Sequence, residues 1–548
     1  MVVGSGILLL SLLLAAQVAA PPATDHPSAS PTPAPSGAAP AGLRLGVVGL
    51  LDTLDPLYAA LPAERDIDAL VFRGLTRAGA GGALVGDLAS SWQVTSNGHT
   101  YTFHLRTDAA WADGQPVTAA DVAYTIRVLQ DPAYDGPNGA AWRGVTVTTP
   151  DAGTVVMALK DAAASFLDVT TQPVVPAHLL EATPVGELPA LGFESQPVGD
   201  GPYQVAGRDG DTVHLVLAPH QAAGQAATIA AGAVPAITFQ LYPDAAALAS
   251  AYRDGDLDSA DGLLPDDAAS IVAQAGSRAL DYPQAMLMAA VMNVRVGQPL
   301  FRDARVRAAL LRAIDRPALV QTVFHGAATV ATTPFPPSTV GLPRPTATAP
   351  PFSTTAAAAA LTAAGWKHGP GGWTAPGVKG VVTFEVVTVE ASANPALNAV
   401  ARAVVGAWTS LGLHVTLAEL PPTELIQQRL LQHDFSVALI EMDLGRVPDL
   451  QPLLISTQAV KGGTNLAGFE NTSFDALLAA AHGYATPAIH TQRVAALTTA
   501  FAAQTPFLPL VFPARVVVYR DAVTGPGIVP LGNPSDRFWD ILDWRLAP

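Results

Sequence analysis

The sequence predicts an α/β protein, in which helices connect the strands of mixed sheets. The clearest pattern covers roughly 60 residues, where short apolar runs alternate with amphipathic segments. Its five elements are strands at Val381–Val389, Leu413–Leu417 and Phe435–Ile440, separated by helices at Ala396–Leu411 and Glu424–Gln432. The chain is 49% hydrophobic and only 14% charged, which supplies enough apolar side chains for large cores. We find no repeat at the periods typical of solenoids.

The first 41 residues predict an exported protein. Residues 1–20 carry no charged side chain, and the apolar run Ile7–Ala16 is followed by small residues at Val18–Ala20. This pattern is typical of a cleaved signal peptide, although no Lys or Arg precedes the apolar run. At about 1.5 Å per residue the segment is also long enough to remain as an anchor in a bilayer of about 30 Å. Both alternatives place the remaining chain outside the cytoplasm. Residues 21–41, rich in Pro, Ala and Ser, predict an extended linker.

The first half of the folded region contains four predicted strands and one clear helix. The helix is predicted at Thr118–Leu129, because Thr118 is a good N-cap residue and Asp121 stands at the third helical position. Alternating or β-branched runs predict the strands at Leu43–Val48, Thr100–Arg106, Val213–Leu217 and Ile237–Leu241.

The second half adds helices on both sides of a proline-dense loop. Apolar residues at helical intervals predict helical structure over Arg302–Phe324, where Pro317 is expected to begin a second helix. The loop is predicted at Pro334–Pro351. Two further helices are predicted at Ser473–Ala485 and Ala488–Phe501.

Charge, cysteine content and motifs exclude several classes of function. The net charge of −16 provides no cationic cluster for a phosphate backbone, so we expect no nucleic-acid partner. The absence of Cys excludes disulfides, thiolate metal sites and a lipid-accepting Cys. The 12 His are scattered, and we find no nucleophile elbow, phosphate loop or zinc-protease motif. We therefore predict a binding protein without cofactor or metal, and not an enzyme.

Short motifs occur in a defined order along the chain. The longest runs are Gly86–Val94, Gly98–Arg106 and Trp111–Val122. Further motifs are Thr53–Pro56, Pro197–Tyr203, Phe301–Arg316, Asn465–Phe469 with Asp475, and Pro506–Leu510. In this order the motifs resemble family 5 solute-binding proteins, which serve ABC transporters for peptides, nickel and related solutes. The resemblance extends from Leu43 to Pro548.

This resemblance implies an α/β fold of the type II periplasmic-binding-protein kind. Two lobes with mixed sheets close on a solute about a hinge, and an extra domain is inserted in the first lobe. The implied boundaries are residues 42–71, 197–293 and 510–548 for lobe I, 72–196 for the inserted domain and 294–509 for lobe II.

The resemblance also implies a ligand site after a strand of lobe II. Peptide-binding members place an Asp there against the α-amine of the peptide, and Asp443 stands at the matching position. Glu441 and Val447 depart from the family pattern, and Arg446 is near enough in sequence to neutralise Asp443 internally. Pairing of Asp443 with the solute and pairing with Arg446 are both open at this point. The full set of predicted ligand-binding residues is Asp443, Glu441, Met442, Leu444, Arg446, Asp449, Asn465 and Tyr58.

The function implied by the resemblance is capture of a peptide-like solute and its delivery to an ABC importer. The expected partners are a small solute and the permease subunits, and we expect a monomer that an N-terminal anchor would hold at the membrane. Two alternatives remain. One is a non-peptide solute such as a metal chelate, an oligosaccharide or a cell-wall fragment, and the other is a tethered sensor or scaffold without a role in transport.

Overall fold

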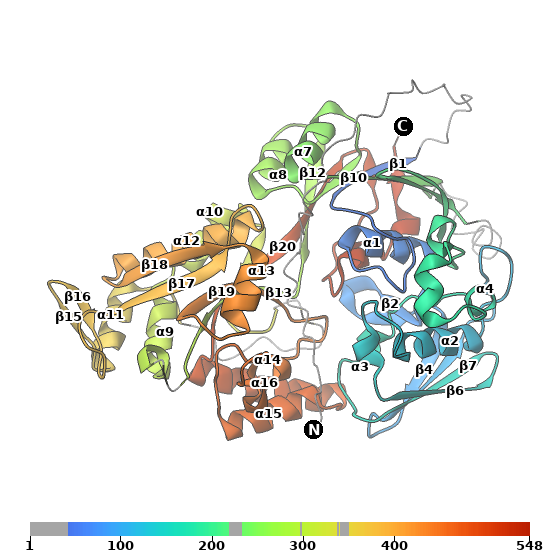
Figure 1. Ribbon diagram of the computed structural model, residues 1–548. Helices are drawn as coiled ribbons and strands as arrows, with labels where there is room; N and C mark the ends of the chain where they lie inside the picture. Colours follow the sequence, from blue (N-terminus) through green and yellow to red (C-terminus); the bar gives the residue numbers. More distant parts are fainter. Residues whose placement is uncertain are drawn as a thin grey trace.

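Two lobes and a smaller inserted domain make up the described part of the chain (Figure 1). This computed structural model describes residues 42–547 except 219–232, 296, 298, 337, 338 and 340–349. The predicted leader at residues 1–20, the predicted linker at residues 21–41 and much of the predicted loop Pro334–Pro351 lie outside the described residues. Within the described residues, none of the helices combines the length and the apolar character that crossing a bilayer requires.

Lobe I is built on one part of a large mixed sheet. Strand β1 pairs in parallel with β10 on one side and with β11 on the other. Helix α1 follows β1, and Pro62 begins it, because the first turn needs no N–H donor there. The elements of lobe I are β1 Leu43–Val48, α1 Pro62–Val71, β8 Tyr203–Asp209, β9 Thr212–Leu217, β10 Ala236–Tyr242, α7 Ala245–Asp254, β11 Ser259–Asp261, α8 Pro265–Val272, β12 Ser277–Pro283, β21 Val523–Thr524, the 3-10 helices η8 Pro534–Phe538 and η9 Ile541–Asp543, and β22 Arg545–Leu546.

The inserted domain carries its own four-stranded antiparallel sheet, in the order β4-β5-β7-β6. Its helix α2 begins after Thr118, as predicted, because Asp121 accepts a hydrogen bond from the Thr118 backbone N–H at 2.8 Å. The elements are β2 Thr76–Ala78, β3 Leu84–Gly86, β4 Ala89–Val94, β5 Thr100–Leu105, α2 Ala119–Gln130, β6 Val145–Asp151, β7 Thr154–Leu159, α3 Phe166–Val169 and α4 Ala177–Leu180.

Lobe II surrounds the second part of the large sheet. Helices cover strands β17, β18 and β19, and α12 buries Trp408 completely (Figure 1). The elements are β13 Met286–Met292, α9 Ala304–Arg312, α10 Arg316–Phe324, β14 Ala328–Val330, α11 Thr354–Ala363, the hairpin β15 Lys367–Gly369 and β16 Gly372–Thr374, β17 Thr383–Val389, α12 Pro395–Ser410, β18 His414–Leu420, α13 Pro422–Glu424, β19 Val437–Asp443, α14 Gln451–Leu454, α15 Thr472–His482 and α16 Pro487–Gln504.

The chain crosses between the lobes at two places. Strand β20, Leu508–Arg520, pairs with β13 and β14 through its first residues and with β11 and β12 through its last residues. Strands β12 and β13 provide the other crossing, and β13 pairs with β19 of lobe II along its whole length. This pairing favours a change of lobe between β12 and β13, which is earlier than the boundary predicted between residues 293 and 294. Lobe I and the inserted domain share one large apolar core, and lobe I has a second, smaller core at α7 and α8. Lobe II has a separate core. This division makes lobe I with the inserted domain one body and lobe II the other.

The structure confirms most of the predicted elements and corrects one. The predicted second helix is present as α10, which begins at Arg316 with Pro317 in its first turn, after Asp315 caps it. The single helix predicted at Glu424–Gln432 is wrong, because only the short α13 is α-helical and the following segment, Leu425–Leu430, is a π-helix. Leu425 and Leu430 are both buried. A π-helix bonds residue i to residue i+5 and so brings both side chains to the same face.

Candidate solute site between the lobes

Arg446 of lobe II connects all three parts of the fold. Its Nε donates to Asp168 Oδ1 of the inserted domain at 2.7 Å, and its Nη2 donates to Asp536 Oδ2 of lobe I at 2.6 Å. Its Nη1 also donates to the backbone oxygen of Gly82 at 3.2 Å. We call Arg446, Asp168 and Asp536 the interlobe clamp. We call the arrangement in which these bonds join lobe II to the other body the closed form.

The interlobe clamp is largely shielded from water. The Arg446 side chain is 7% exposed, Asp536 is 9% exposed and Asp168 is 24% exposed. The backbone N–H groups of Gly532 and Asn533 also donate to Asp536, at 2.7 and 2.8 Å. The carboxylate of Asp536 is therefore held in place by its own turn, and Arg446 completes its set of donors.

A second contact joins lobe II to the inserted domain beyond the end of α15. The backbone N–H of Ala164 donates to the His482 oxygen at 3.0 Å, and that of Tyr484 donates to the Ala162 oxygen at 3.0 Å. Ala163 and Gly483 form an antiparallel β-bridge between these bonds. Figure 1 shows α15 and α16 extending toward the inserted domain at this contact. The closed form is thus held at two separate places.

Asp443, the predicted amine-binding residue, lies at the end of β19 close to the clamp. Its Oδ1 accepts a hydrogen bond from the Gly445 N–H at 2.9 Å, in a tight turn for which Gly445 takes a φ of 70°. Among the described residues, no cation forms an ion pair with this half-buried carboxylate. Burial raises the pKa of Asp443, the charge of Asp168 raises it further, and the charge of Arg65 lowers it. Asp443 is therefore a carboxyl group that has a backbone hydrogen-bond donor but no cationic partner among the described residues.

Glu441 reinforces the acidic character of this strand end. It lies two residues before Asp443 on β19, so both side chains point to the same side of the sheet. Asn394 Nδ2 donates to Glu441 Oε2 at 3.3 Å. Burial raises the pKa of Glu441 to about 7, and the neighbouring charge of Asp443 adds to the rise. Two adjacent carboxylates of which one holds its proton near neutral pH favour a cationic group nearby.

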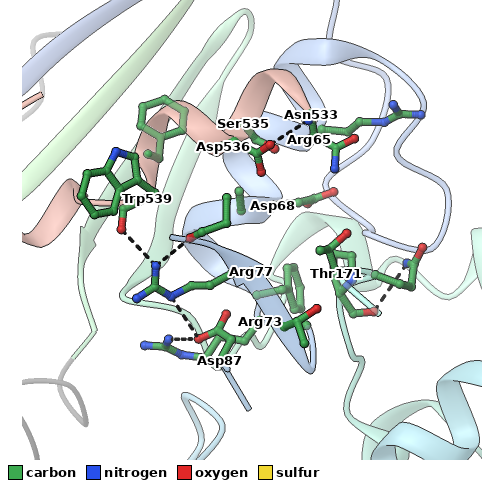
Figure 2. A pocket seen from close by; sticks show the side chains of 18 of the residues that line it. Arg65, Asp68, Arg73, Arg77, Asp87, Thr171, Asn533, Ser535, Asp536 and Trp539 are labelled. Carbon is green, nitrogen blue, oxygen red and sulfur yellow. Dashed lines mark hydrogen bonds and ion pairs between the residues drawn. The ribbon is translucent and has the colours of Figure 1, made fainter. Parts of the chain in front are cut away.

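A cavity of about 640 Å³ lies between lobe I and the inserted domain (Figure 2). Among the described residues, its lining comes from these two parts only, and it includes Asp168 and Asp536 of the clamp. Arg73 and Arg77 in its wall both reach Asp87, Arg77 with its Nε 4.0 Å from Asp87 Oδ1. Asp443 does not line this cavity. One shared apolar core lies behind both walls of this cavity.

Three of the predicted ligand-binding residues lie in the interior of lobe II. Met442 and Leu444 alternate with the acidic residues of β19 and are buried in the lobe II core. Asn465 is completely buried, where its Nδ2 donates to the backbone oxygens of Leu454 and Phe469 at 3.1 and 2.8 Å. These contacts stabilise the fold of lobe II, and contact with a solute stays a prediction for the three residues.

The two remaining predicted residues lie apart from Asp443. Asp449 accepts from His482 Nδ1 at 2.7 Å and from the Gln451 N–H at 2.9 Å, which places it at the second interlobe contact. Tyr58 belongs to lobe I, where its ring lies 5.4 Å from that of Tyr134 and its hydroxyl is 3.5 Å from the Val185 oxygen. The structure thus brings Glu441, Asp443 and Arg446 together and leaves Asp449 and Tyr58 in separate places.

The geometry also answers the question of the Arg446 partner. Among the described residues, Arg446 forms its ion pairs with Asp168 and Asp536, not with Asp443. Neither partner was among the predicted site residues, because they lie 278 and 90 residues away in sequence and belong to no motif. The structure describes no group of three or more His, Cys, Asp or Glu side chains, within its residues, that would hold a metal ion.

Comparison with known proteins identifies the family. The family model for bacterial extracellular solute-binding proteins, family 5, middle region, matches residues 83–463. The chain belongs to this family. Protein XP55 of Streptomyces lividans is 30% identical over 447 residues, which cover 79% of this chain and 76% of that protein. Membership places the protein among extracytoplasmic solute-binding proteins, as the motifs predicted.

Solved structures show the same fold as this family 5 protein. CtaP of Listeria monocytogenes, an ABC transporter substrate-binding protein, is 20% identical, with a TM-score of 0.78 over 93% of this chain and 100% of that chain. The oligopeptide-binding protein AppA of Bacillus subtilis, solved in complex with a nonapeptide, is 22% identical, with a TM-score of 0.69 over 92% of this chain and 99% of that chain. These similarities confirm the predicted two-lobed α/β fold with an inserted domain and a hinge.

Proposed function

We propose that this family 5 protein captures a peptide-like solute between its lobes and delivers it to the membrane subunits of an ABC importer. Family membership supports a solute-binding role, and the peptide-binding relative AppA supports the class of solute. The observation that carries the proposal is Asp443, a half-buried carboxylate at the lobe interface with no cation beside it among the described residues. A buried carboxylate costs several kcal/mol unless a positive group accompanies it, and the amine of a peptide supplies that group.

Closure gives this capture its mechanism. Solute on Asp443 is covered when Arg446 reaches Asp168 and Asp536, and the β-bridge between Ala163 and Gly483 forms at the second contact. A solute that binds the closed form better than the open form shifts the population toward closure. No group of the solute changes covalently, so the protein acts as a carrier and not as an enzyme.

The experiment is calorimetric titration with pools of di- to pentapeptides, followed by scattering to measure closure. We expect wild-type protein to bind and contract, and Asp443→Asn to lose at least about tenfold in affinity, because a hydrogen bond to a charged group contributes about 1.5–3 kcal/mol. Asp434→Asn is the matched control, since Asp434 is an exposed acid of the same lobe. Equal affinity of the wild type and Asp443→Asn would remove Asp443 from the site. Peptides that fail to bind the wild type would refute the peptide cargo, and thermal-shift screening with metal chelates, oligosaccharides and cell-wall fragments would then identify the class.

The cellular arrangement completes the proposal. We infer that residues 1–20 either direct export and are cleaved or remain as an anchor, and that residues 21–41 then act as a spacer for a monomeric head. Sequencing the N-terminus of the mature protein from membrane and soluble fractions distinguishes the two. An intact residue 1 in the membrane fraction supports the anchor, and a mature N-terminus near Ala20 supports cleavage.

A further inference from the structure

Glu441 and Asp443 are two carboxyl side chains on one face of β19, at the end of the strand. Alternate residues of a strand point to the same side, and their positions are about 6.6–6.8 Å apart along the chain. Asp168 and Arg65, both from the other body, lie close enough for their charges to act on Asp443. This face of the strand end is therefore turned toward the closing interface, while Met442 between the two acids points into the lobe II core.

The side chain of Glu441 is held by the start of helix α12. Asn394, the N-cap residue, accepts a hydrogen bond from the Leu397 N–H with its Oδ1 at 2.9 Å. Its Nδ2 is therefore left to donate to Glu441 Oε2, at 3.3 Å. An amide is a neutral donor, so this contact orients the carboxyl group without compensating a negative charge. Among the described residues, no donor forms a hydrogen bond with Oε1, and Glu441 is only half-buried, so a group of the solute can reach this oxygen.

No positive side chain compensates this pair of acids. Among the described residues, neither Glu441 nor Asp443 forms an ion pair. The arginine nearest to them in sequence, Arg446, is engaged in the interlobe clamp. Burial raises the pKa of both carboxyl groups, and the charge of Asp443 raises that of Glu441 further. Two positive groups on a solute would remove this repulsion and allow both acids to ionise.

Building on the proposed function, we infer that Glu441 selects solutes whose first residue has a positively charged side chain. The α-amine of the peptide binds Asp443, and the ammonium or guanidinium group of its first side chain binds Glu441 by a charge-assisted hydrogen bond. A lysine side chain carries its ammonium on a long, flexible stem. It can therefore place this charge about as far from the α-amine as Glu441 lies from Asp443. This assignment makes the cargo a peptide that begins with a basic residue.

Binding of a positive side chain at Glu441 should release protons from the protein. The pKa of Glu441 is about 7, so at pH 7 about half of the molecules hold a proton on this group. A cation beside the carboxyl group lowers its pKa, and the proton then leaves when the peptide binds. A peptide without the positive side chain leaves this proton in place. Calorimetry in buffers with different ionisation enthalpies measures the number of protons released.

The test is calorimetric titration with two matched pools of di- to pentapeptides. One pool begins with lysine, and the other begins with norleucine, which lacks only the terminal ammonium. The proteins are the wild type, Glu441→Gln, Asp443→Asn and the control Glu470→Gln, since Glu470 is an exposed acid of the same lobe. We expect the wild type and the control to bind the lysine pool about tenfold or more tightly than the norleucine pool. At pH 7 the lysine pool should release about half a proton more per peptide.

The two site variants should lose different parts of this behaviour. Glu441→Gln keeps an oxygen that accepts the hydrogen bond from Asn394. It should bind the two pools within about twofold of each other, and the difference in proton release should disappear. Asp443→Asn should bind both pools more weakly and should still prefer the lysine pool, because it removes only the contact with the α-amine.

The outcomes separate this inference from the proposal on which it rests. A wild type without preference for the lysine pool, or an unchanged preference in Glu441→Gln, overturns the role of Glu441 and leaves the peptide cargo intact. Equal weakening of both pools in Glu441→Gln would show that Glu441 acts on the α-amine together with Asp443, which also overturns the selection of the side chain. The absence of binding by the wild type to every peptide refutes the peptide cargo and, with it, this assignment.

Discussion

Replacing Arg446 with methionine removes the charged contact of the interlobe clamp while keeping much of the side-chain volume. In the open form, water solvates Asp168 and Asp536 separately. We therefore expect the substitution to destabilise the closed form but not the folding of either lobe. Arg446 forms hydrogen bonds to both carboxylates, at 2.7 and 2.6 Å, and only 7% of its side chain is exposed. This contact is therefore among the strongest single differences between the open and closed forms.

The size of the effect follows from what each carboxylate keeps after the substitution. A hydrogen bond between charged groups contributes about 1.5–3 kcal/mol. The two hydrogen bonds of Arg446 together contribute less than twice this value, because the charges lose their hydration when the contact forms. Asp536 still accepts hydrogen bonds from the N–H groups of Gly532 and Asn533, and Asp168 is 24% exposed to water. Neither carboxylate is therefore left buried without a hydrogen-bond donor. We expect closure to weaken by about 2–3 kcal/mol, which corresponds to about 30- to 150-fold in solute affinity if the unliganded protein is mainly open.

Two measurements test this prediction. Calorimetric titration with a peptide measures the affinity, and small-angle scattering with and without the peptide measures closure of the lobes. Arg446→Met should bind about 30- to 150-fold more weakly and should contract less, while its thermal midpoint without solute stays near that of the wild type. Arg446→Lys keeps the charge but reaches only one carboxylate well, so an intermediate affinity is expected. An Arg446→Met variant that contracts and binds as the wild type does would refute a role of the clamp in closure.

Two further predictions concern the stability of the lobes. The hydrogen bond that His482 donates to Asp449 raises the pKa of His482 above its usual 6.5, assisted by the charges of Asp449 and Asp161. The stabilisation by this pair is therefore complete below pH 6.5 and is lost as pH rises through the raised pKa. Because His482 is 35% exposed, we expect the pair to contribute less than about 1 kcal/mol to the free energy of unfolding. His482→Gln should flatten the pH dependence of the thermal midpoint above pH 6.5. Arg537→Met should lower the free energy of unfolding by about 3–5 kcal/mol, because it leaves the carboxylate of Asp66 buried without a cation. In the wild type, Arg537 donates two hydrogen bonds to Asp66, at 2.6 and 2.7 Å. The double variant with Asp66→Asn should recover part of the loss in thermal unfolding, and an equal loss in both variants would contradict this origin.

Local patterns predicted the elements of this fold because their causes are local. The start of α2 depends on Thr118 and Asp121, which are three residues apart, and the start of α10 depends on Pro317 and the preceding Asp315. The π-helix at Leu425–Leu430 escaped prediction because its apolar spacing also fits an α-helix. The two-lobed arrangement depended on a series of motifs, since no short pattern specifies how distant strands pair.

The candidate site was only partly predictable because its contacts join distant parts of the chain. The sequence placed acids and Arg446 together at the end of β19, and it left pairing of Asp443 with Arg446 and with the solute both open. In the structure, the guanidinium of Arg446 forms ion pairs with Asp168 and Asp536 across the interface.

The clamp and the hinge are connected through one short 3-10 helix. Asp536 and Arg537 are neighbours in η8, and Arg537 is 2% exposed with its Nη2 3.0 Å from Asp261 Oδ2 of β11. Asp261 also binds Arg515 of β20 at 2.8 Å, on the strand that crosses between the lobes. Asp536, Arg537 and Asp261 belong to lobe I, and Arg515 lies in the part of β20 that pairs with β12 of the same lobe. We therefore expect the network to hold Asp536 in the same position in the open and closed forms. Closure then needs only the arrival of Arg446 at an acceptor that is already oriented, which keeps the entropic cost of forming the contact low.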